Sequence, residues 1–375
     1  MNVMTRCDKN RAAASVLLAF GLAAAAHAQP VAAPAVRAPA AIAATAPASA
    51  LPAADALFTD PALKETLALI VLKDGKPIYE RYAPGYGPGT RLISWSMAKS
   101  ITSTLVGFLV ADGKLELDMP APVPEWRQDA RAKITLRQLL HMASGVRHIE
   151  AGPEPERADT NRALFADTSA DIYKAAVAQP AQVPPGTRFE YNTLTTHILA
   201  RIVSDSVAPG ASPEQRRRAV RAFINDRLAR PAGMASLLCE FDPQGNLLGG
   251  SLCHATARDW AAFGQMFLDG GVVAGVQVVR PDWVRFVTTP SPTNAGYGGQ
   301  FWLNRRQVSG EDNALFWRAG PADAFAALGH LGQYVIAVPS KRLVVVRLGK
   351  TQDESLQPVR DALSKLVNGF PVAAK

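Results

Sequence analysis

Apolar residues form strand-like runs near both ends of the chain and repeat at helical spacing between them. The runs at 67–72 and 77–82 flank Asp74-Gly75, and Asp-Gly between two apolar runs predicts a β-hairpin. Further strand patterns follow near the C-terminus, at 300–303, 324–328, 334–338 and 343–348. We therefore expect both ends of the chain to supply strands.

Helix signals fill the middle of the chain. Capping boxes begin helices at Thr135 and Ser212, and Thr256 opens another helix with large apolar residues on one face. Ile101, Leu105, Phe108 and Leu109 repeat at helical spacing, and the helix they predict starts near Ser96 and stops at Gly113. A last helix is predicted over 358–367.

The economical fold is mixed α/β, of the α+β kind. One antiparallel sheet is built from the N- and C-terminal strands and flanked by helices, and an all-helical subdomain is inserted into it. Residues 57–95 and 291–375 are assigned to the sheet subdomain and 96–290 to the helical subdomain. The cleft between the two is the expected place for a site.

The N-terminal region is expected to lie outside this fold. Residues 1–28 combine a basic start, an apolar stretch too short to cross a bilayer and the small-residue cleavage motif Ala26-His27-Ala28, which together predict a secretory signal peptide. An uncleaved anchor is the alternative. Residues 29–56 are rich in Ala and Pro and are interpreted as a tether. The predicted location is periplasmic or secreted, with no stable membrane insertion after cleavage.

The charge, the cysteines and the absence of metal-binding motifs limit which partners and cofactors we expect. The 375-residue chain has a formal net charge of +8, but its densest basic run, 216–218, lies on a helix pattern with a buried side, so we expect a solvated face and no nucleic-acid partner. Cys239 and Cys253 remain after signal cleavage and could pair as a disulfide in an oxidising compartment. No His-Glu-x-x-His or Cys-x-x-Cys pattern occurs, so neither a metal nor another cofactor is assigned.

The candidate chemistry starts at Ser96-Met97-Ala98-Lys99. On a helix, a lysine three residues after a serine lies on the same face and can activate the serine hydroxyl as a nucleophile. Chance gives the same spacing often, and the alternative is a surface lysine that follows a serine.

Two other stretches could complete such a site. Tyr191 follows a turn and could pass a proton to a leaving group if nearby cations lower its pKa, although a lone Tyr is more often part of a core. His330-Leu331-Gly332 lies at a strand edge, where small residues let a backbone N–H approach a substrate. The alternative for His330 is a structural role.

Taken together, the three stretches resemble the motif set of the serine β-lactamase and penicillin-binding protein superfamily. Their order and spacing are similar to those of its class C branch. The sequence around Tyr191, together with Gly332-Gln333, is most similar to the 6-aminohexanoate-dimer hydrolase subgroup. The resemblance covers about Leu67 to Leu366.

The resemblance implies roles for individual residues. Ser96 would be the acylated nucleophile, Lys99 its general base and Tyr191 the proton relay. The backbone N–H groups of Ser96 and Gln333 would form the oxyanion hole. The remaining substrate-binding positions implied by the resemblance are His330, Gly332 and Asn192.

One departure from the class C pattern affects the substrate. Class C enzymes usually have Tyr-x-Asn, whereas Thr193 stands at that third position here. We therefore expect an exported serine hydrolase that cleaves a small amide, ester or peptide-like substrate through an acyl-enzyme. The alternatives are a β-lactamase, a D-alanyl-D-alanine carboxypeptidase, or a receptor that binds penicillin or peptidoglycan without turnover.

Overall fold

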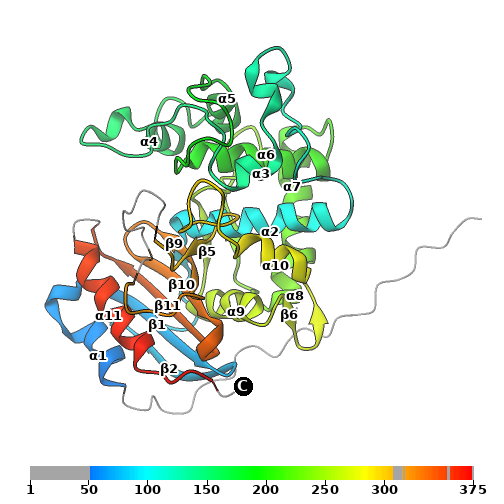
Figure 1. Cartoon of the computed structure of the whole chain (residues 1–375). Coiled ribbons are helices and arrows are strands. Elements are labelled where there is room, and N and C mark those ends of the chain that lie inside the picture. The colour runs from blue at the N-terminus through cyan, green and yellow to red at the C-terminus, as the bar shows by residue number, and fades with distance from the viewer. Residues whose placement is uncertain (1–50, 307–314, 316, 353–354, 374–375) are drawn as a thin grey trace, which may run out of the picture. The chain divides into compact units, whose positions relative to one another are not determined.

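A six-stranded antiparallel sheet organises the structure, a computed structural model that describes residues 51–306, 315, 317–352 and 355–373. The strand order is β2-β1-β11-β10-β9-β8. These strands are β1 (Glu65–Lys73), β2 (Lys76–Tyr82), β8 (Trp302–Leu303), β9 (Phe325–Gly329), β10 (Gln333–Val338) and β11 (Leu343–Lys350). The N-terminal hairpin therefore pairs with the C-terminal strands through β1 and β11, which confirms the predicted sheet (Figure 1).

Local sequence signals determine the turns and helix starts as predicted. Asp74 and Gly75 both have positive φ, 52° and 73°, and connect β1 to β2. Thr135 and Ser212 each form a complete capping box, and the Thr256 side chain accepts a hydrogen bond from the backbone N–H of Asp259.

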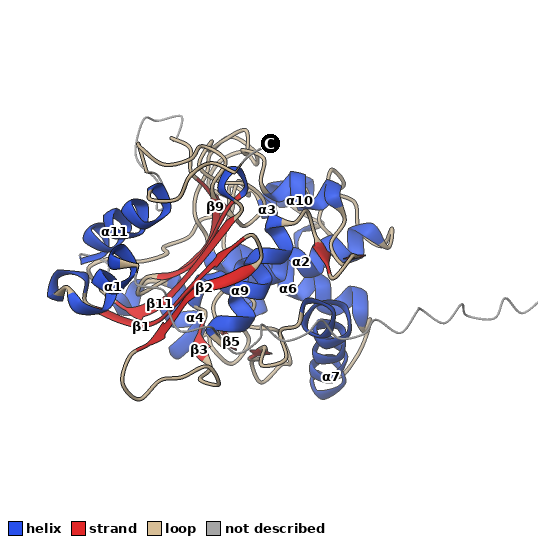
Figure 2. Cartoon of the chain, turned by 90° about the horizontal axis from the view of Figure 1, so that it is seen from below, coloured by secondary structure: helices blue, strands red, loops and turns tan. Residues whose placement is uncertain are grey.

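Helices cover both faces of the sheet (Figure 2). On one face lie α1 (Pro52–Thr59) and α11 (Leu356–Asn368), with Leu57, Val359 and Leu363 in a shared core. On the other face lies α9 (Ala257–Leu268), and Gly264 of α9 approaches the sheet so closely that a Cβ there would be 2.8 Å from Cγ1 of both Val335 and Val344.

The remaining helices belong to the region between β3 and β8. They are α2 (Ala98–Ala111), α3 (Leu136–Leu140), α4 (Asp159–Phe165), α5 (Ile172–Val177), α6 (Thr193–Val207), α7 (Pro213–Ile224), α8 (Arg230–Ala232) and α10 (Pro281–Val287). Short strands accompany them: β3 (Leu92–Ile93), β4 (Leu238–Cys239) and β5 (Cys253–Ala255) form one sheet, and β6 (Val272–Val273) pairs with β7 (Val276–Gln277).

Two predicted boundaries need correction. The region 96–290 is not all-helical, because it contains β4 to β7 and because α9 packs on the main sheet through Phe263 and Gly264. Residues 52–56 form the start of α1 and are not tether, since Ala54 and Leu57 are fully buried against the sheet. The predicted signal peptide, 1–28, and the tether up to residue 50 lie outside the described residues.

Candidate active site

Ser96 lies in a single 3₁₀ turn, Trp95–Met97, directly before α2. Trp95 has a φ of 45°, a left-handed conformation that costs free energy for a bulky residue and is common at active sites. Two hydrogen bonds to β5 anchor the residue before this turn. The N–H of Ser94 donates to the Cys253 carbonyl, and the N–H of Cys253 donates to the Ser94 hydroxyl. Ser96 is thereby presented at the junction of α2, β5 and the end of β9.

Lys99 lies one turn after Ser96, fully inside the protein, with 1% of its surface exposed. Its Nζ lies 3.0 Å from Ser96 Oγ, 2.7 Å from Thr193 Oγ1 and 2.8 Å from the Gly250 carbonyl oxygen. Burial lowers the pKa of Lys99 to about 8, and the charge of Glu150 partly opposes this shift. At pH 7 about a tenth of Lys99 is therefore a neutral amine.

Glu150 is part of this site, although no motif in the sequence indicates it. Its carboxylate accepts hydrogen bonds from Thr193 Oγ1 at 2.5 Å and from the Thr193 N–H at 2.8 Å, and it lies 2.6 Å from His148 Nε2. Burial alone would raise the pKa of Glu150, but the hydrogen bond with His148 and the charge of Lys99 lower it to about 2. Glu150 is therefore a carboxylate that reaches Lys99 through the Thr193 hydroxyl.

Tyr191 completes the group around the serine. Its hydroxyl is hydrogen-bonded to Ser96, and its ring centroid lies 4.9 Å from Lys99 Nζ. Burial, reinforced by the charge of Glu150, raises the pKa of Tyr191 well above its usual value. The hypothesis that cations lower this pKa is wrong, because desolvation is the largest cause of the shift and raises the pKa. Tyr191 is a neutral phenol at neutral pH, so it can pass a proton along but cannot act as a stable phenolate.

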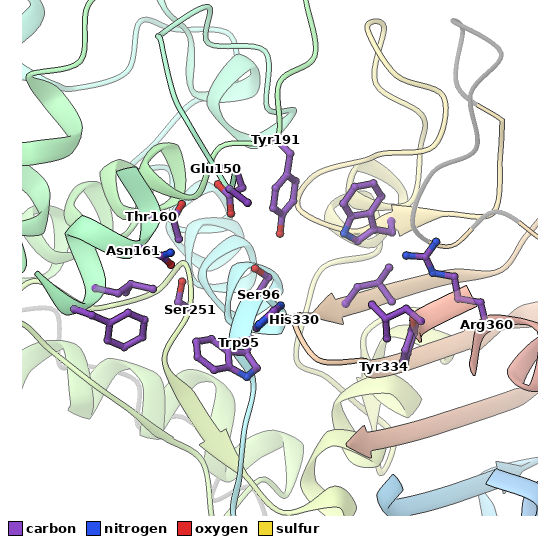
Figure 3. A pocket seen from close by; sticks show the side chains of 17 residues that line it. Trp95, Ser96, Glu150, Thr160, Asn161, Tyr191, Ser251, His330, Tyr334 and Arg360 are labelled. Atoms are coloured by element: carbon purple, nitrogen blue, oxygen red, sulfur yellow. The ribbon is translucent and has the colours of Figure 1, made fainter. Parts of the chain in front are cut away.

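These residues open into a cavity of about 680 Å³ (Figure 3). Glu150, Thr160 and Asn161 come from the helical side, and Tyr334 and Arg360 come from the sheet side. The rest of the wall is mostly aromatic or aliphatic: Trp95, Leu164, Phe165, Trp302, Leu328 and Leu356. The cavity fits a small molecule with a largely apolar body.

The structure places His330-Leu331-Gly332 in the turn between β9 and β10. His330 lines the cavity and packs edge-on against Trp95, with ring centroids 5.3 Å apart. Gly332 has a φ of 77°, and a Cβ there would lie 2.4 Å from the Arg347 guanidinium, so this glycine is required by the turn. Gly332 is not part of the cavity wall, and its predicted contact with substrate needs correction.

Gln333 also serves the turn. Its side-chain amide donates to the carbonyls of His330 and Gly349, and it accepts the N–H of Gly349. Its backbone is paired with Gly329 inside the sheet. Gln333 is therefore not placed to supply the predicted oxyanion-hole N–H.

The hydrogen-bond alternation of β9 shows which of its residues direct their N–H groups to the β8 edge. In an antiparallel strand, successive residues direct their N–H and C=O groups to opposite edges. The N–H of Asn304 donates to the Ala324 carbonyl at 2.8 Å, so Ala324, Ala326 and Leu328 face the β8 edge. Strand β8 pairs only as far as Ala326, and Leu328 lies beyond it in the cavity wall. The N–H of Leu328 therefore faces the β8 edge of β9 beyond the last β8 pair, and Leu328 and Ser96 line the same cavity.

Asn192 is not available to a substrate. It is buried, is absent from the cavity wall, and its Oδ1 accepts the N–H of Thr195 as the N-cap of α6. Its predicted substrate-binding role is therefore corrected to a capping role.

Cys239 and Cys253 form a disulfide that joins β4 to β5. The loop between β4 and β5 carries Gly250, whose carbonyl contacts Lys99, and Ser251, which lines the cavity. The disulfide therefore supports one wall of the site. Within the described ranges, no group of three or more His, Cys, Asp or Glu side chains is arranged to hold a metal ion, and no helix combines the length and apolar character needed to cross a bilayer.

Comparisons of the amino-acid sequence with known proteins gave matches that cover most of the chain. A protein-family model described as Beta-lactamase matches residues 58–368. The curated 6-aminohexanoate-dimer hydrolase of Paenarthrobacter ureafaciens is 27% identical over 320 residues, which are 80% of this chain and 78% of that protein.

Solved structures show the same fold at lower identity. A Bacillus anthracis protein, proposed to be a 6-aminohexanoate-dimer hydrolase, has a TM-score of 0.66 at 23% identity and covers 82% of this chain and 79% of its own. A family VIII carboxylesterase has a TM-score of 0.63 at 16% identity, over 85% of this chain and 95% of its own.

Proposed function

Since the chain belongs to the beta-lactamase family and is a serine hydrolase, we propose that Ser96 is its nucleophile and that small amides or esters are its substrates. The observation that carries the proposal is the buried contact of 3.0 Å between Lys99 Nζ and Ser96 Oγ. A lysine with a lowered pKa, held against a serine hydroxyl, is the arrangement that nucleophilic catalysis requires.

The hydrogen bonds around Lys99 direct its lone pair at the serine. Because Thr193 donates its only hydroxyl proton to the Glu150 carboxylate, the Thr193 oxygen must accept from Lys99. The Gly250 carbonyl can only accept as well. Neutral Lys99 has two N–H protons, and both are used by Thr193 and Gly250. The lone pair is left facing Ser96 Oγ, where a general base must have it.

Acylation follows from this arrangement. Ser96 Oγ attacks the substrate carbonyl carbon while its proton moves to Lys99. The carbonyl oxygen becomes an oxyanion that the N–H groups of Ser96 and Leu328 stabilise, and loss of one such donor typically costs about 3 kcal/mol. When the intermediate collapses, the bond to the leaving nitrogen or oxygen breaks. The leaving group takes a proton from the Tyr191 hydroxyl, which regains one from Lys99.

Deacylation uses the same groups in reverse roles. Water approaches the acyl carbon, gives its proton through Tyr191 to Lys99, and forms the new C–O bond. The ester bond to Ser96 Oγ then breaks and the serine regains its proton. The neutral phenol of Tyr191 suits this role, because it donates and accepts a proton in the same step.

A linear amide or an ester suits the site better than a β-lactam. The amide side chain that class C enzymes present at the third position of Tyr-x-Asn is replaced here by Thr193, whose hydroxyl is fully used by Lys99 and Glu150. The 6-aminohexanoate-dimer hydrolase among the relatives supports a linear amide. We also propose export, which the pattern of residues 1–28 supports, with mature protein beginning at Gln29.

Intact mass spectrometry with a fluorophosphonate, a penicillin and a p-nitrophenyl ester tests the proposal. A fluorophosphonate adduct on Ser96 and a transient acyl adduct from the ester are expected. Ser96→Ala should lower ester hydrolysis by about a thousandfold or more, whereas Ser206→Ala, on α6, serves as the control. Unchanged hydrolysis in Ser96→Ala refutes the assignment of the nucleophile, and a permanent penicillin adduct without ester turnover refutes hydrolysis as the function.

A further inference from the structure

His148 lies behind the catalytic group and is not part of the cavity wall. Its side chain has no exposed surface, and its Nε2 lies 2.6 Å from Glu150 Oε2. Because the ionised Glu150 carboxylate can only accept, this contact requires that His148 carries a proton on Nε2 and donates it. Thr160 Oγ1 lies farther from the same nitrogen, at 3.2 Å. His148 therefore gives Glu150 a short, charge-assisted hydrogen bond.

The other ring nitrogen of His148 faces Asp159, the first residue of α4. The Asp159 carboxylate accepts the N–H of Ile149 at 2.8 Å, and the same Oδ2 lies 3.7 Å from His148 Nδ1. Arg147 lies 3.9 Å from the second oxygen of Asp159. Asp159 thus anchors the backbone next to His148, and Nε2 is left as the nitrogen that meets Glu150.

Few charged groups compete for the negative charge of Glu150. Besides His148, titratable groups of neighbouring segments interact electrostatically with it: Lys99 of α2, His197 of α6, Tyr191 and Tyr297. Burial lowers the pKa of His197 to about 3 and raises the pKa values of both tyrosines, so these three groups are neutral at pH 7. Lys99 is therefore the cation whose hold on Glu150 a hydrogen bond from His148 can change.

We propose that His148 is a positioning residue that takes up part of the Glu150 charge, so that Lys99 gives up its proton more easily. The inference rests on the proposed role of Lys99 as general base and adds a residue that adjusts it. Without His148, Glu150 would stay a carboxylate, because both hydrogen bonds from Thr193 and the charge of Lys99 still favour that form. Its charge would then act on the Lys99 ammonium undiminished, and less of the enzyme would have a neutral base at pH 7.

The pH profile of kcat/KM for ester hydrolysis tests this role. His148→Leu removes the donor, and the amide of His148→Asn reaches only to the place of Nδ1. The rising limb of both variants should therefore move up by about half a pH unit. His148→Gln reaches the place of Nε2 and can donate to Glu150, so its limb should stay near that of the wild type. His254→Asn is the matched control, because His254 Nε2 also lies 2.6 Å from a glutamate, Glu240, and neither residue lines the cavity.

A double variant tests whether His148 acts through Glu150. Once Glu150→Gln has removed the carboxylate, adding His148→Asn should not move the limb any further. Three results in variants that melt cooperatively overturn the role while hydrolysis at Ser96 stands: a lower kcat/KM without a shifted limb in His148→Asn, a His148→Gln limb displaced as far as that of His148→Asn, or a further shift in the double variant. If Ser96→Ala still hydrolyses the ester at the wild-type rate, the proposed function fails first, and the inference that rests on it fails with it.

Discussion

Replacement of Glu150 by Gln removes the negative charge nearest to the catalytic lysine while keeping the size of the side chain. Thr193 Oγ1 lies 2.7 Å from Lys99 Nζ and 2.5 Å from Glu150 Oε1, which places the two charges no more than about 5 Å apart. At that distance an effective dielectric of about 20 gives an attraction of about 3 kcal/mol, or about two pKa units. Because 29% of the Glu150 side chain is exposed in the cavity, screening should reduce the effect to about one unit.

The pH profile of kcat/KM measures this shift. In the wild type the rate should rise with pH through about 8, since Lys99 must lose its proton to act as a base. Loss of the Glu150 charge destabilises the ammonium form of Lys99, so the rising limb should move down to about pH 7. Glu214→Gln, an exposed carboxylate on α7, is the control and should leave the limb in place. A limb that stays at its wild-type pH or moves upward in Glu150→Gln would show that Glu150 does not act on Lys99.

Three further changes have definite expected results. Lys99→Met should abolish ester hydrolysis yet raise the free energy of unfolding at pH 6 by about 2 kcal/mol. Because the folded-state pKa of Lys99 is lowered to about 8, the free energy of unfolding of the wild type should rise between about pH 8 and 10.5. The difference in stability between Lys99→Met and the wild type should therefore shrink over that pH range, as urea titrations would show. Replacing both Cys239 and Cys253 by Ala should lower the free energy of unfolding by about 3 kcal/mol, and an equal stability with and without reductant in the wild type would contradict the disulfide. Gly264→Ala should lower the free energy of unfolding by about 1–3 kcal/mol and lower the melting temperature, because the added Cβ would lie 2.8 Å from a Val344 methyl group. An unchanged melting temperature would mean that α9 does not pack on the sheet as described.

Turns and helix starts, which depend on residues adjacent in the sequence, were predictable from the sequence. Contacts between segments that are distant in the sequence were not. The Asp74-Gly75 turn and the Thr135 and Ser212 caps each depend on a few consecutive residues, so their sequence carries the whole signal. The position of α9 on the main sheet was missed. Its apolar face predicts that it is buried, but periodicity does not say which partner covers that face.

The same distinction applies to the site. Ser96, Lys99 and Tyr191 were identified because the first two are linked by helical spacing and the third by resemblance, and the structure brings all three together. Glu150 was missed because its partner Thr193 is 43 positions away and a lone glutamate in a polar loop has no distinctive pattern. The role of such a carboxylate becomes recognisable only when the lysine it faces is known.

The predicted oxyanion donor, Gln333, differs from the proposed donor, Leu328, for a more general reason. A backbone N–H has no side-chain signature, and the residue that supplies it is decided by the alternation of the strand, where a shift of one position turns the group to the other edge. Gly332 marks the turn that follows β9, whereas the proposed donor, Leu328, lies before the turn. Side chains other than Pro at position 328 would keep the N–H and change only the wall of the cavity. Variation there should therefore alter which substrates fit while leaving the stabilisation of the oxyanion intact.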